Sequence, residues 1–543
     1  MGFAPGGVAV GTGVVRFVAH RLASLLVLLA GIAGVSAEEF RTPAVSLVRV
    51  DWRAALDRLR SEIGTQPTVT PSFTFSGRRR LPGFDPRSMP ALVQLNAVTS
   101  KFFTGIGRSP VPVLLPFDTA AFLGAQSSGA PAGPSRFQAD FRPVDVFDAG
   151  QAGYDAVFSL EPGVGDGMPQ RTFARPVEVQ ITGSILVYEI NDPQGGKGEP
   201  VKSLASQFPD LRRFIREGYV RYAFTRFGVP YVVSIQCLDS SPRPRRLACR
   251  EAYPVAERFL KALHVAGGLP SRARMDAASE VVERPLAASS DFTYRAAGDI
   301  IARSGSRKQG GRADFTAYSQ IRFPLEETPA FIHSQSFGKR RLASELAGGP
   351  TSYPWQDNFC EARSFSVGQC PSGFGHQGED IRAAACPPQS DGPDRCDPKQ
   401  KGVVAVRDAV VIRSPKQQAA TLQVNTRTEH IRFRYMHMNP FALDADRILN
   451  GREVAEGEKI GVVSNYLDRP NGTTRHLHFD VQVFTRDGWL WVNPYVTLIS
   501  AYERLIRGRG REIGPPAMPS SADVAHAMPQ DAIRPGIGEG GEN

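Results

Sequence analysis

Three short stretches of this sequence place histidine and aspartate at spacings that suit a metal ion. The first holds His376 and Asp380, which stand four positions apart and therefore share one face of either a strand or a helix. The neighbouring Gly373, Gly375 and Gly378 argue against a helix and favour a turn that leads into a strand. Imidazole and carboxylate are both good zinc ligands, although this pair alone is weak evidence for a metal site.

The other two stretches lie later in the chain and also centre on histidine. His476 and His478 flank one apolar residue in an alternating run. On a strand, both would project to the same face, while Leu477 and Phe479 would point into a core. Two histidines on one strand face are costly to bury without a purpose. His437 follows another β-type run, where a single histidine is more often structural than functional.

Taken together and in this order, the three stretches resemble the LytM/lysostaphin-type zinc endopeptidases. That family is marked by H-x-G-x-D, a central histidine after a strand, and a late H-x-H on a strand. The surrounding sequence is similar as well, in the strand-like run at 402–411, the turn at 454–461 and the pair Asn493-Pro494. The resemblance covers residues 320–500, a third of the chain.

The resemblance implies a site with one Zn²⁺ per chain. The ligands that it implies are His376, Asp380 and His478, and the catalytic residues that would line the site are His437 and His476. Three protein ligands on a tetrahedral ion leave one position for water, as in catalytic zinc sites. The ion would lower the pKa of that water to about 7 and polarise a carbonyl. Either His437 or His476 would accept the proton or stabilise the oxyanion.

The function that the resemblance implies is zinc-dependent hydrolysis of peptide bonds in peptidoglycan stem peptides or cross-links. Peptidoglycan peptides would be the binding partner. No nucleic-acid partner is expected, because the net charge of +10 comes without a dense basic block interleaved with aromatic residues.

Two other interpretations compete with this one. A non-catalytic wall-binding or activating partner of another wall hydrolase would have lost ligands, whereas all five site residues are present here. The metal motif of β-lactamase-fold hydrolases also opens with His-x-His-x-Asp. In that fold a histidine usually follows the aspartate, but Val481 stands at that place.

Several domains are expected, because 543 residues are too many for one hydrophobic core. Short β-type runs and frequent turn residues at 320–506 predict a mainly-β catalytic domain built on an antiparallel sheet. Residues 38–270 mix helical and β-rich stretches and predict an N-terminal α+β domain of unknown role. By composition, 271–319 is a linker and 507–543 is a disordered tail.

Residues 1–37 have the features of a secretory signal peptide, with basic residues, a short apolar run and small residues before a polar start. The run is shorter than the ~20 residues needed to span a bilayer, so no stable membrane span is expected after cleavage. An uncleaved anchor is the alternative. The protein is therefore expected to be exported, and to be periplasmic or associated with the cell wall.

The six cysteines agree with export, since an even number in an exported chain indicates disulfides. Cys237 and Cys249 flank a loop rich in Pro, Arg and Ser and are predicted to pair with each other. A four-thiolate zinc site is disfavoured, because no C-x-x-C spacing occurs. Four cysteines remain, with three connectivities open to them: Cys360, Cys370, Cys386 and Cys396.

Overall fold

The computed structural model describes most of the chain after the first 43 residues. The described residues are 2, 44–63, 89–127, 133–142, 146–160, 173, 176–190, 198–237, 245–270, 291–300, 320–333, 354–363, 365–370, 373–383, 400–466, 468 and 475–514. The predicted signal peptide at 1–37 lies outside them except for Gly2, as do Cys386 and Cys396. Within the described ranges, no helix is long and apolar enough to cross a membrane.

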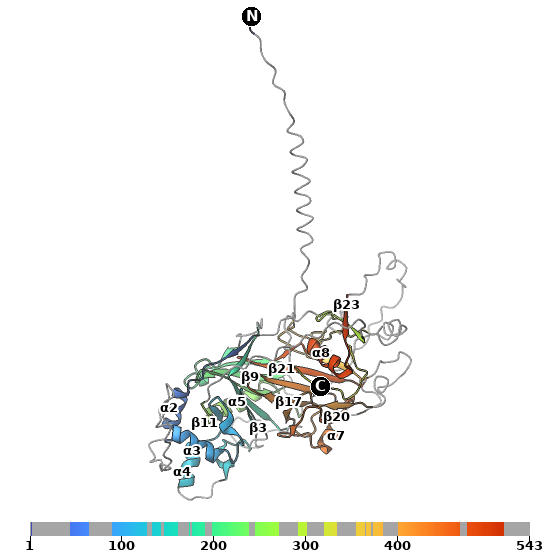
Figure 1. Cartoon of the computed structure of the whole chain (residues 1–543). Helices are drawn as coiled ribbons and strands as arrows, with labels where there is room; N and C mark the ends of the chain where they lie inside the picture. The colour runs from blue at the N-terminus through green and yellow to red at the C-terminus, as the bar shows by residue number, and fades with distance from the viewer. Residues whose placement is uncertain are drawn as a thin grey trace, which may run out of the picture.

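The N-terminal part of the protein, blue to green in Figure 1, is built on a large antiparallel sheet. This sheet has seven strands in the order β3-β4-β5-β10-β9-β8-β7. The strands are β3 (Val146–Ala149), β4 (Gly153–Ser159), β5 (Glu178–Ser184), β7 (Glu199–Pro200), β8 (Arg212–Arg216), β9 (Tyr219–Arg226) and β10 (Val229–Gln236). The helices beside it are α2 (Trp52–Ile63), α3 (Met89–Thr99), α4 (Thr119–Ser127) and α5 (Ala252–Lys261). Two antiparallel pairs complete this part: β1 (Ala44–Leu47) with β6 (Leu186–Glu189), and β2 (Val113–Leu115) with β11 (His264–Gly267).

The hairpin between β9 and β10 shows how local sequence sets this sheet. Phe227 and Gly228 form the turn with φ values of 55° and 75°. Positive φ at both central residues gives a turn whose twist matches that of the flanking strands. A side chain at Gly228 would also meet the Arg49 carbonyl oxygen, since a Cβ placed there lies 2.4 Å from it.

The C-terminal part contains the eight-stranded antiparallel sheet that carries the predicted site residues. Its order is β13-β14-β21-β18-β17-β16-β19, with β22 paired to β21. The strands are β13 (Phe331–Ile332), β14 (Glu379–Arg382), β16 (Ala409–Ile412), β17 (Ala420–Asn425), β18 (His430–Met436), β19 (Glu453–Val454), β21 (Leu477–Thr485) and β22 (Gly488–Val492). Beside it lie α7 (Pro440–Ala445), α8 (Tyr495–Ile506) and the pair β15 (Gly402–Val404) with β20 (Lys459–Val462). The predicted mainly-β, antiparallel, multidomain class is confirmed.

Two short strands lie in stretches that the sequence analysis assigned to a linker and a disordered tail. Strand β12 (Phe292–Arg295) pairs in parallel with β23 (Gly510–Ile513). Phe292 packs in the hydrophobic core of the C-terminal part, with its ring centre 4.9 Å from that of Trp355. These two strands therefore belong to the C-terminal fold, and the prediction was wrong for them.

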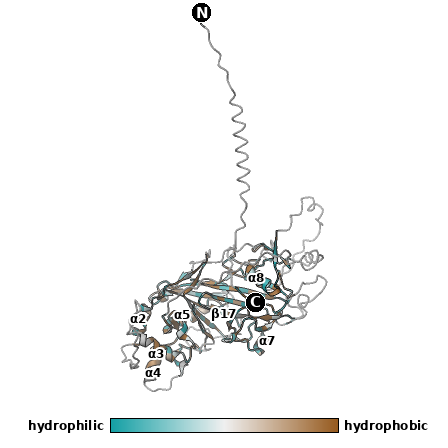
Figure 2. Ribbon diagram, viewed as in Figure 1, coloured by the Kyte–Doolittle hydropathy of each residue, from teal (hydrophilic) through white to brown (hydrophobic). Residues whose placement is uncertain are grey.

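The two large sheets pack against each other through a buried polar cluster. His430 Nε2 on β18 lies 2.6 Å from Asp155 Oδ2 on β4, and Arg432 Nη2 donates to Asp155 Oδ1 at 3.0 Å. Thr182 donates to the same carboxylate at 2.6 Å and accepts from Trp489 Nε1 at 3.2 Å. Apolar side chains complete the contact, in one cluster of Ala223, Val232, Phe484 and Trp489 and another of Val146, Val157 and Ile412. Hydrophobic and hydrophilic residues both occur along the strands of the two sheets (Figure 2).

This contact occupies one end of the sheet face that carries the predicted ligand His478. In the β18–β21 pairing, Met436 faces His478 and Arg432 faces Gln482. Directly opposed residues of antiparallel strands share a face, as do alternate residues along one strand. Arg432 and His478 therefore project from the same side, with the N-terminal sheet over the Arg432 end.

Candidate metal centre

Neighbouring strands bring the first and last sequence motifs together. Asp380 on β14 is paired directly with His478 on β21, so the two side chains lie next to each other on one face of the sheet. His376 precedes β14 in a tight turn that needs glycine. A Cβ at Gly378 would lie 2.4 Å from the Phe479 carbonyl oxygen, and one at Gly375 would lie 2.8 Å from Cys370 Sγ.

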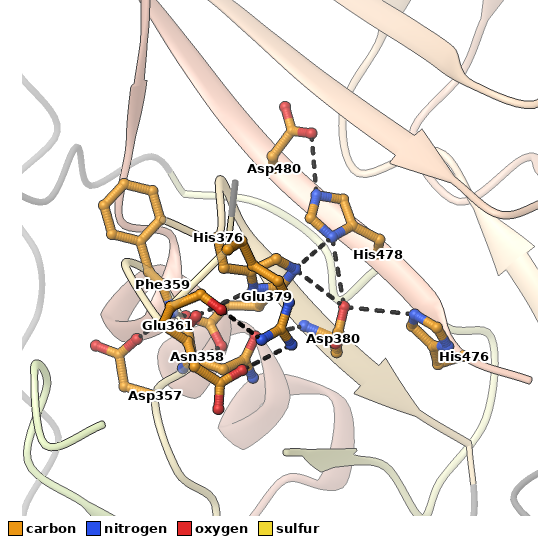
Figure 3. A network of polar contacts seen from close by, with 12 residues as sticks. Asp357, Asn358, Phe359, Glu361, His376, Glu379, Asp380, His476, His478 and Asp480 are labelled. Atoms are coloured by element: carbon orange, nitrogen blue, oxygen red, sulfur yellow. Dashed lines mark hydrogen bonds and ion pairs between the residues drawn. The ribbon is translucent and has the colours of Figure 1, made fainter. Parts of the chain in front are cut away.

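The three predicted ligand atoms form a compact triangle (Figure 3). His376 Nε2 lies 3.0 Å from His478 Nδ1 and 3.3 Å from Asp380 Oδ1, and the third side, from His478 Nδ1 to Asp380 Oδ1, is 3.4 Å. Ligands bound tetrahedrally at 2.0–2.1 Å are separated by about 3.3 Å. Asp380 Oδ2 is buried without a hydrogen-bond partner among the described residues. The donor set and its spacing therefore fit a small tetrahedral metal ion.

A second layer of contacts fixes the orientation of these ligands. His376 Nδ1 lies 3.0 Å from the Asn358 carbonyl oxygen, and the Asn358 side chain accepts from the Asp380 backbone N–H at 2.9 Å. His478 Nε2 lies 3.3 Å from Asp480 Oδ2. Partners of this kind fix which ring nitrogen is free to bind an ion. Asn358 has no spacing signal in the sequence and was not predicted. Asp480 was also missed, although it shares the face of His478 two residues further on.

Two buried carboxyl groups, those of Glu379 and Asp357, lie against the backbone around Asn358. Glu379 accepts hydrogen bonds at 3.2 Å from the backbone N–H groups of Asn358 and Phe359. Asp357 accepts from the Asn493 side chain at 2.7 Å. Burial and the nearby Asp357 charge raise the pKa of Glu379 well above its usual value.

The Cys360–Cys370 disulfide closes the loop that presents His376. The Cys360 backbone N–H donates to the His376 carbonyl oxygen at 2.9 Å, and the His376 N–H donates to the Glu361 carbonyl oxygen at 2.8 Å. The predicted pairing of Cys237 with Cys249 is confirmed. Among the four cysteines whose connectivity was open, the structure therefore pairs the two that precede the ligands.

The two histidines predicted to line the site lie on its other side. His476 Nε2 is 3.4 Å from Asp380 Oδ1, and the His437 ring centre is 4.7 Å from that of His476 and 6.0 Å from that of His478. His437 adopts a positive φ of 66°, which is uncommon for a residue other than glycine, and its carbonyl oxygen accepts from the Tyr466 N–H at 2.8 Å. His437 is partly exposed, whereas the other four residues are buried. The structure thus gathers all five predicted residues into one cluster.

The charges in the cluster are strongly coupled. Burial would raise the pKa of Asp380, but the imidazoles of His376 and His476 hold it well below its usual value. Loss of hydration, together with the neighbouring imidazoles of His476 and His478, holds the pKa of His437 well below its usual value. At neutral pH, the cluster therefore offers an ionised carboxylate to a cation and a neutral imidazole at its open side.

Neither a protein-family model nor a curated protein matches the chain. Among solved structures, it is similar to a candidate glycyl-glycine endopeptidase, LytM, from Ruminococcus gnavus, with 21% identity over 25% of this chain and 50% of that chain and a TM-score of 0.18. It is also similar to chains in two structures of the SpoIIQ–SpoIIIAH complex, one of which is described as a pore-forming complex. These have 12% and 14% identity, cover 34% and 32% of this chain and 96% and 98% of those chains, and have TM-scores of 0.19. Each similarity covers only part of this chain. The chain spans half the length of the first structure that it matches.

Proposed function

We propose that this protein is a zinc-dependent endopeptidase that hydrolyses peptide bonds in peptidoglycan stem peptides or cross-links. The observation that carries the proposal is the triangle of His376 Nε2, Asp380 Oδ1 and His478 Nδ1, with His437 and His476 beside it as histidines outside the ligand set. The choice of peptidoglycan comes from the sequence motifs that resemble the LytM/lysostaphin-type enzymes.

Zinc is the ion that best suits this donor set, since two imidazoles and one carboxylate are typical of catalytic zinc sites. When bound, Zn²⁺ would polarise the scissile carbonyl and supply a water with a pKa of about 7. Asn358 and Asp480 would hold the ligand histidines in their binding tautomers, through the contacts at 3.0 and 3.3 Å.

The protein's own proton-transfer groups in this proposal are His437 and His476. Both are histidines outside the ligand triangle, and His437 is the one that solvent reaches. A neutral imidazole there can accept the proton of the attacking water and return it to the leaving amine. The His437 backbone is held by the hydrogen bond from the Tyr466 N–H, and its imidazole lies beside the rings of His476 and His478.

We further propose that the protein is exported and acts in the periplasm or at the cell wall. The disulfides Cys237–Cys249 and Cys360–Cys370 support an oxidising compartment. The predicted signal peptide and the substrate are in keeping with this location.

The test is digestion of purified wall fragments, with mass analysis of the products. The zinc-loaded protein should release peptide fragments, a chelator should abolish release, and added Zn²⁺ should restore it. His264→Ala, which changes a histidine in the N-terminal part, serves as the matched control and should remain active. A protein that binds zinc and wall fragments but cuts none would favour the alternative, a non-catalytic partner of another wall hydrolase.

A further inference from the structure

We propose that Arg434 forms a carboxylate-binding position beside the metal centre, which holds substrate peptides through a free carboxylate near the bond that is cut. The inference rests on the proposed peptidase function and narrows its substrate class.

Arg434 lies on the same sheet face as the ligand His478. In the pairing of β18 with β21 it stands directly opposite Asp480, two residues from Met436, which faces His478. Arg434 Nε donates to Asp480 Oδ2 at 2.7 Å, and that oxygen lies 3.3 Å from His478 Nε2. The guanidinium is therefore two hydrogen-bond lengths from Nε2 of the ligand His478, whose Nδ1 belongs to the ligand triangle.

The donors of Arg434 are only partly used. A guanidinium has five N–H donors, and the hydrogen bond to Asp480 takes the one on Nε. Nη2 is buried without a hydrogen-bond partner among the described residues, while 13% of the side chain remains exposed. A buried donor without a partner is uncommon in native proteins, and a water, an ion or a bound group is among the partners that can satisfy it. Trp491, whose ring centre lies 5.1 Å from the guanidinium carbon, helps to fix the plane of the group.

A carboxylate is the ligand that suits these donors. Asp480 is already shared, since its Oδ1 accepts from Trp491 Nε1 at 2.9 Å and its Oδ2 accepts from Arg434. With one Zn²⁺ bound, the ion, Asp380, Asp480 and Arg434 together leave one net positive charge, which a carboxylate would balance. The planar fork of a guanidinium binds a carboxylate through two parallel hydrogen bonds.

The competing explanation is that Arg434 acts only through Asp480, as a positioning residue for His478. The two explanations differ in what substitution does to substrate choice. Loss of a carboxylate-binding group removes discrimination between an acid and its amide. Loss of a positioning group lowers the rate for both to the same extent.

The experiment compares one stem-peptide substrate with a free terminal carboxylate and the same peptide as its terminal amide. The wild-type protein should prefer the carboxylate form by about 10- to 100-fold in kcat/KM, mainly through KM. Arg434→Gln should lose most of that preference and keep its zinc. Arg427→Gln, an exposed arginine in the β17–β18 turn, should behave as wild type.

Each outcome decides between the explanations. Equal cutting of both forms by the wild type, or an equal loss for both in Arg434→Gln, would overturn the carboxylate position and leave the peptidase function standing. Should the wild type cut no wall fragment at all, the proposed function itself fails. If Arg434→Gln does not fold, the wild-type preference and that of Arg434→Lys decide, because lysine keeps a positive charge but not the planar fork.

Discussion

Two neighbouring aspartates in the contact between the sheets should respond in opposite ways to the same substitution. Asp155 on β4 and Asp148 on β3 are directly paired across the strands. Asp155 is buried and neutralises Arg432, whereas Asp148 lies beside the Asp155 charge without such a partner in the described contacts. Asp→Asn should therefore destabilise the fold at position 155 and stabilise it at position 148.

The magnitudes follow from the surroundings of each carboxylate. Burial would raise the pKa of Asp155, but His430 and Arg432 lower it, so its contribution to stability is present at neutral pH and is lost as the pH falls through that lowered value. Asp155→Asn leaves Arg432 buried without its counter-charge, a change that costs about 3–5 kcal/mol.

The effect at Asp148 has the opposite sign. Burial and the Asp155 charge raise the pKa of Asp148 to about 6. This rise in pKa means that ionised Asp148 lowers the free energy of unfolding by roughly 2–3 kcal/mol. The penalty is complete above pH 6 and vanishes as the pH falls through the usual carboxyl value, where Asp148 is protonated in both folded and unfolded chains. Asp148→Asn should remove this penalty at neutral pH.

The assay is denaturant unfolding of both variants at pH 7.5 and pH 4.5, followed by tryptophan fluorescence and circular dichroism. At pH 7.5 the midpoint should fall for Asp155→Asn and rise for Asp148→Asn, and the gain at position 148 should shrink at pH 4.5. Equal shifts of the same sign for the two variants would refute the argument, because they would show that the two carboxylates share one environment.

Other predictions concern the metal centre and the contact between the sheets. His478→Ala should lose zinc and activity together. His437→Ala should keep most of its zinc, and its kcat should fall about 10²- to 10⁴-fold. Equal zinc loss in the two variants, measured by metal analysis, would contradict this division of roles. Asp480→Asn should weaken zinc binding by about 10- to 100-fold in a competition titration, and unchanged affinity would argue against its role behind His478. A fragment that begins at residue 291 should melt below the full chain, because it exposes the buried face around Arg432; an unchanged melting temperature would show that the contact adds no stability.

Local sequence patterns predict the parts of the site that lie on one strand or one turn. The alternation around His478 places it and His476 on one strand segment, and the glycines before Asp380 predict the turn that the structure shows. The pairing of Asp380 with His478 depends on the register between segments 98 residues apart, which no local pattern encodes. The family resemblance implied only that both residues bind one ion, and therefore that the two segments lie close together.

The missed features depend on long-range contacts. Asn358 reaches two ligands from a loop without a recognisable motif, and Glu379 next to Asp380 is buried by its contact with that loop. Strands β12 and β23 escaped prediction because they are short and pair in parallel across more than 200 residues of chain. The contact around Asp155 likewise joins strands from the two halves of the protein. In each case tertiary packing, and not local propensity, decides the structure.

The most direct test is a crystal structure of the zinc-loaded protein with diffraction measured at the zinc absorption edge. The account predicts one anomalous peak per chain, about 2.0–2.2 Å from His376 Nε2, Asp380 Oδ1 and His478 Nδ1, with His437 and His476 outside bonding distance. Absence of a peak within this triangle, or a peak bound to other side chains, would contradict the account.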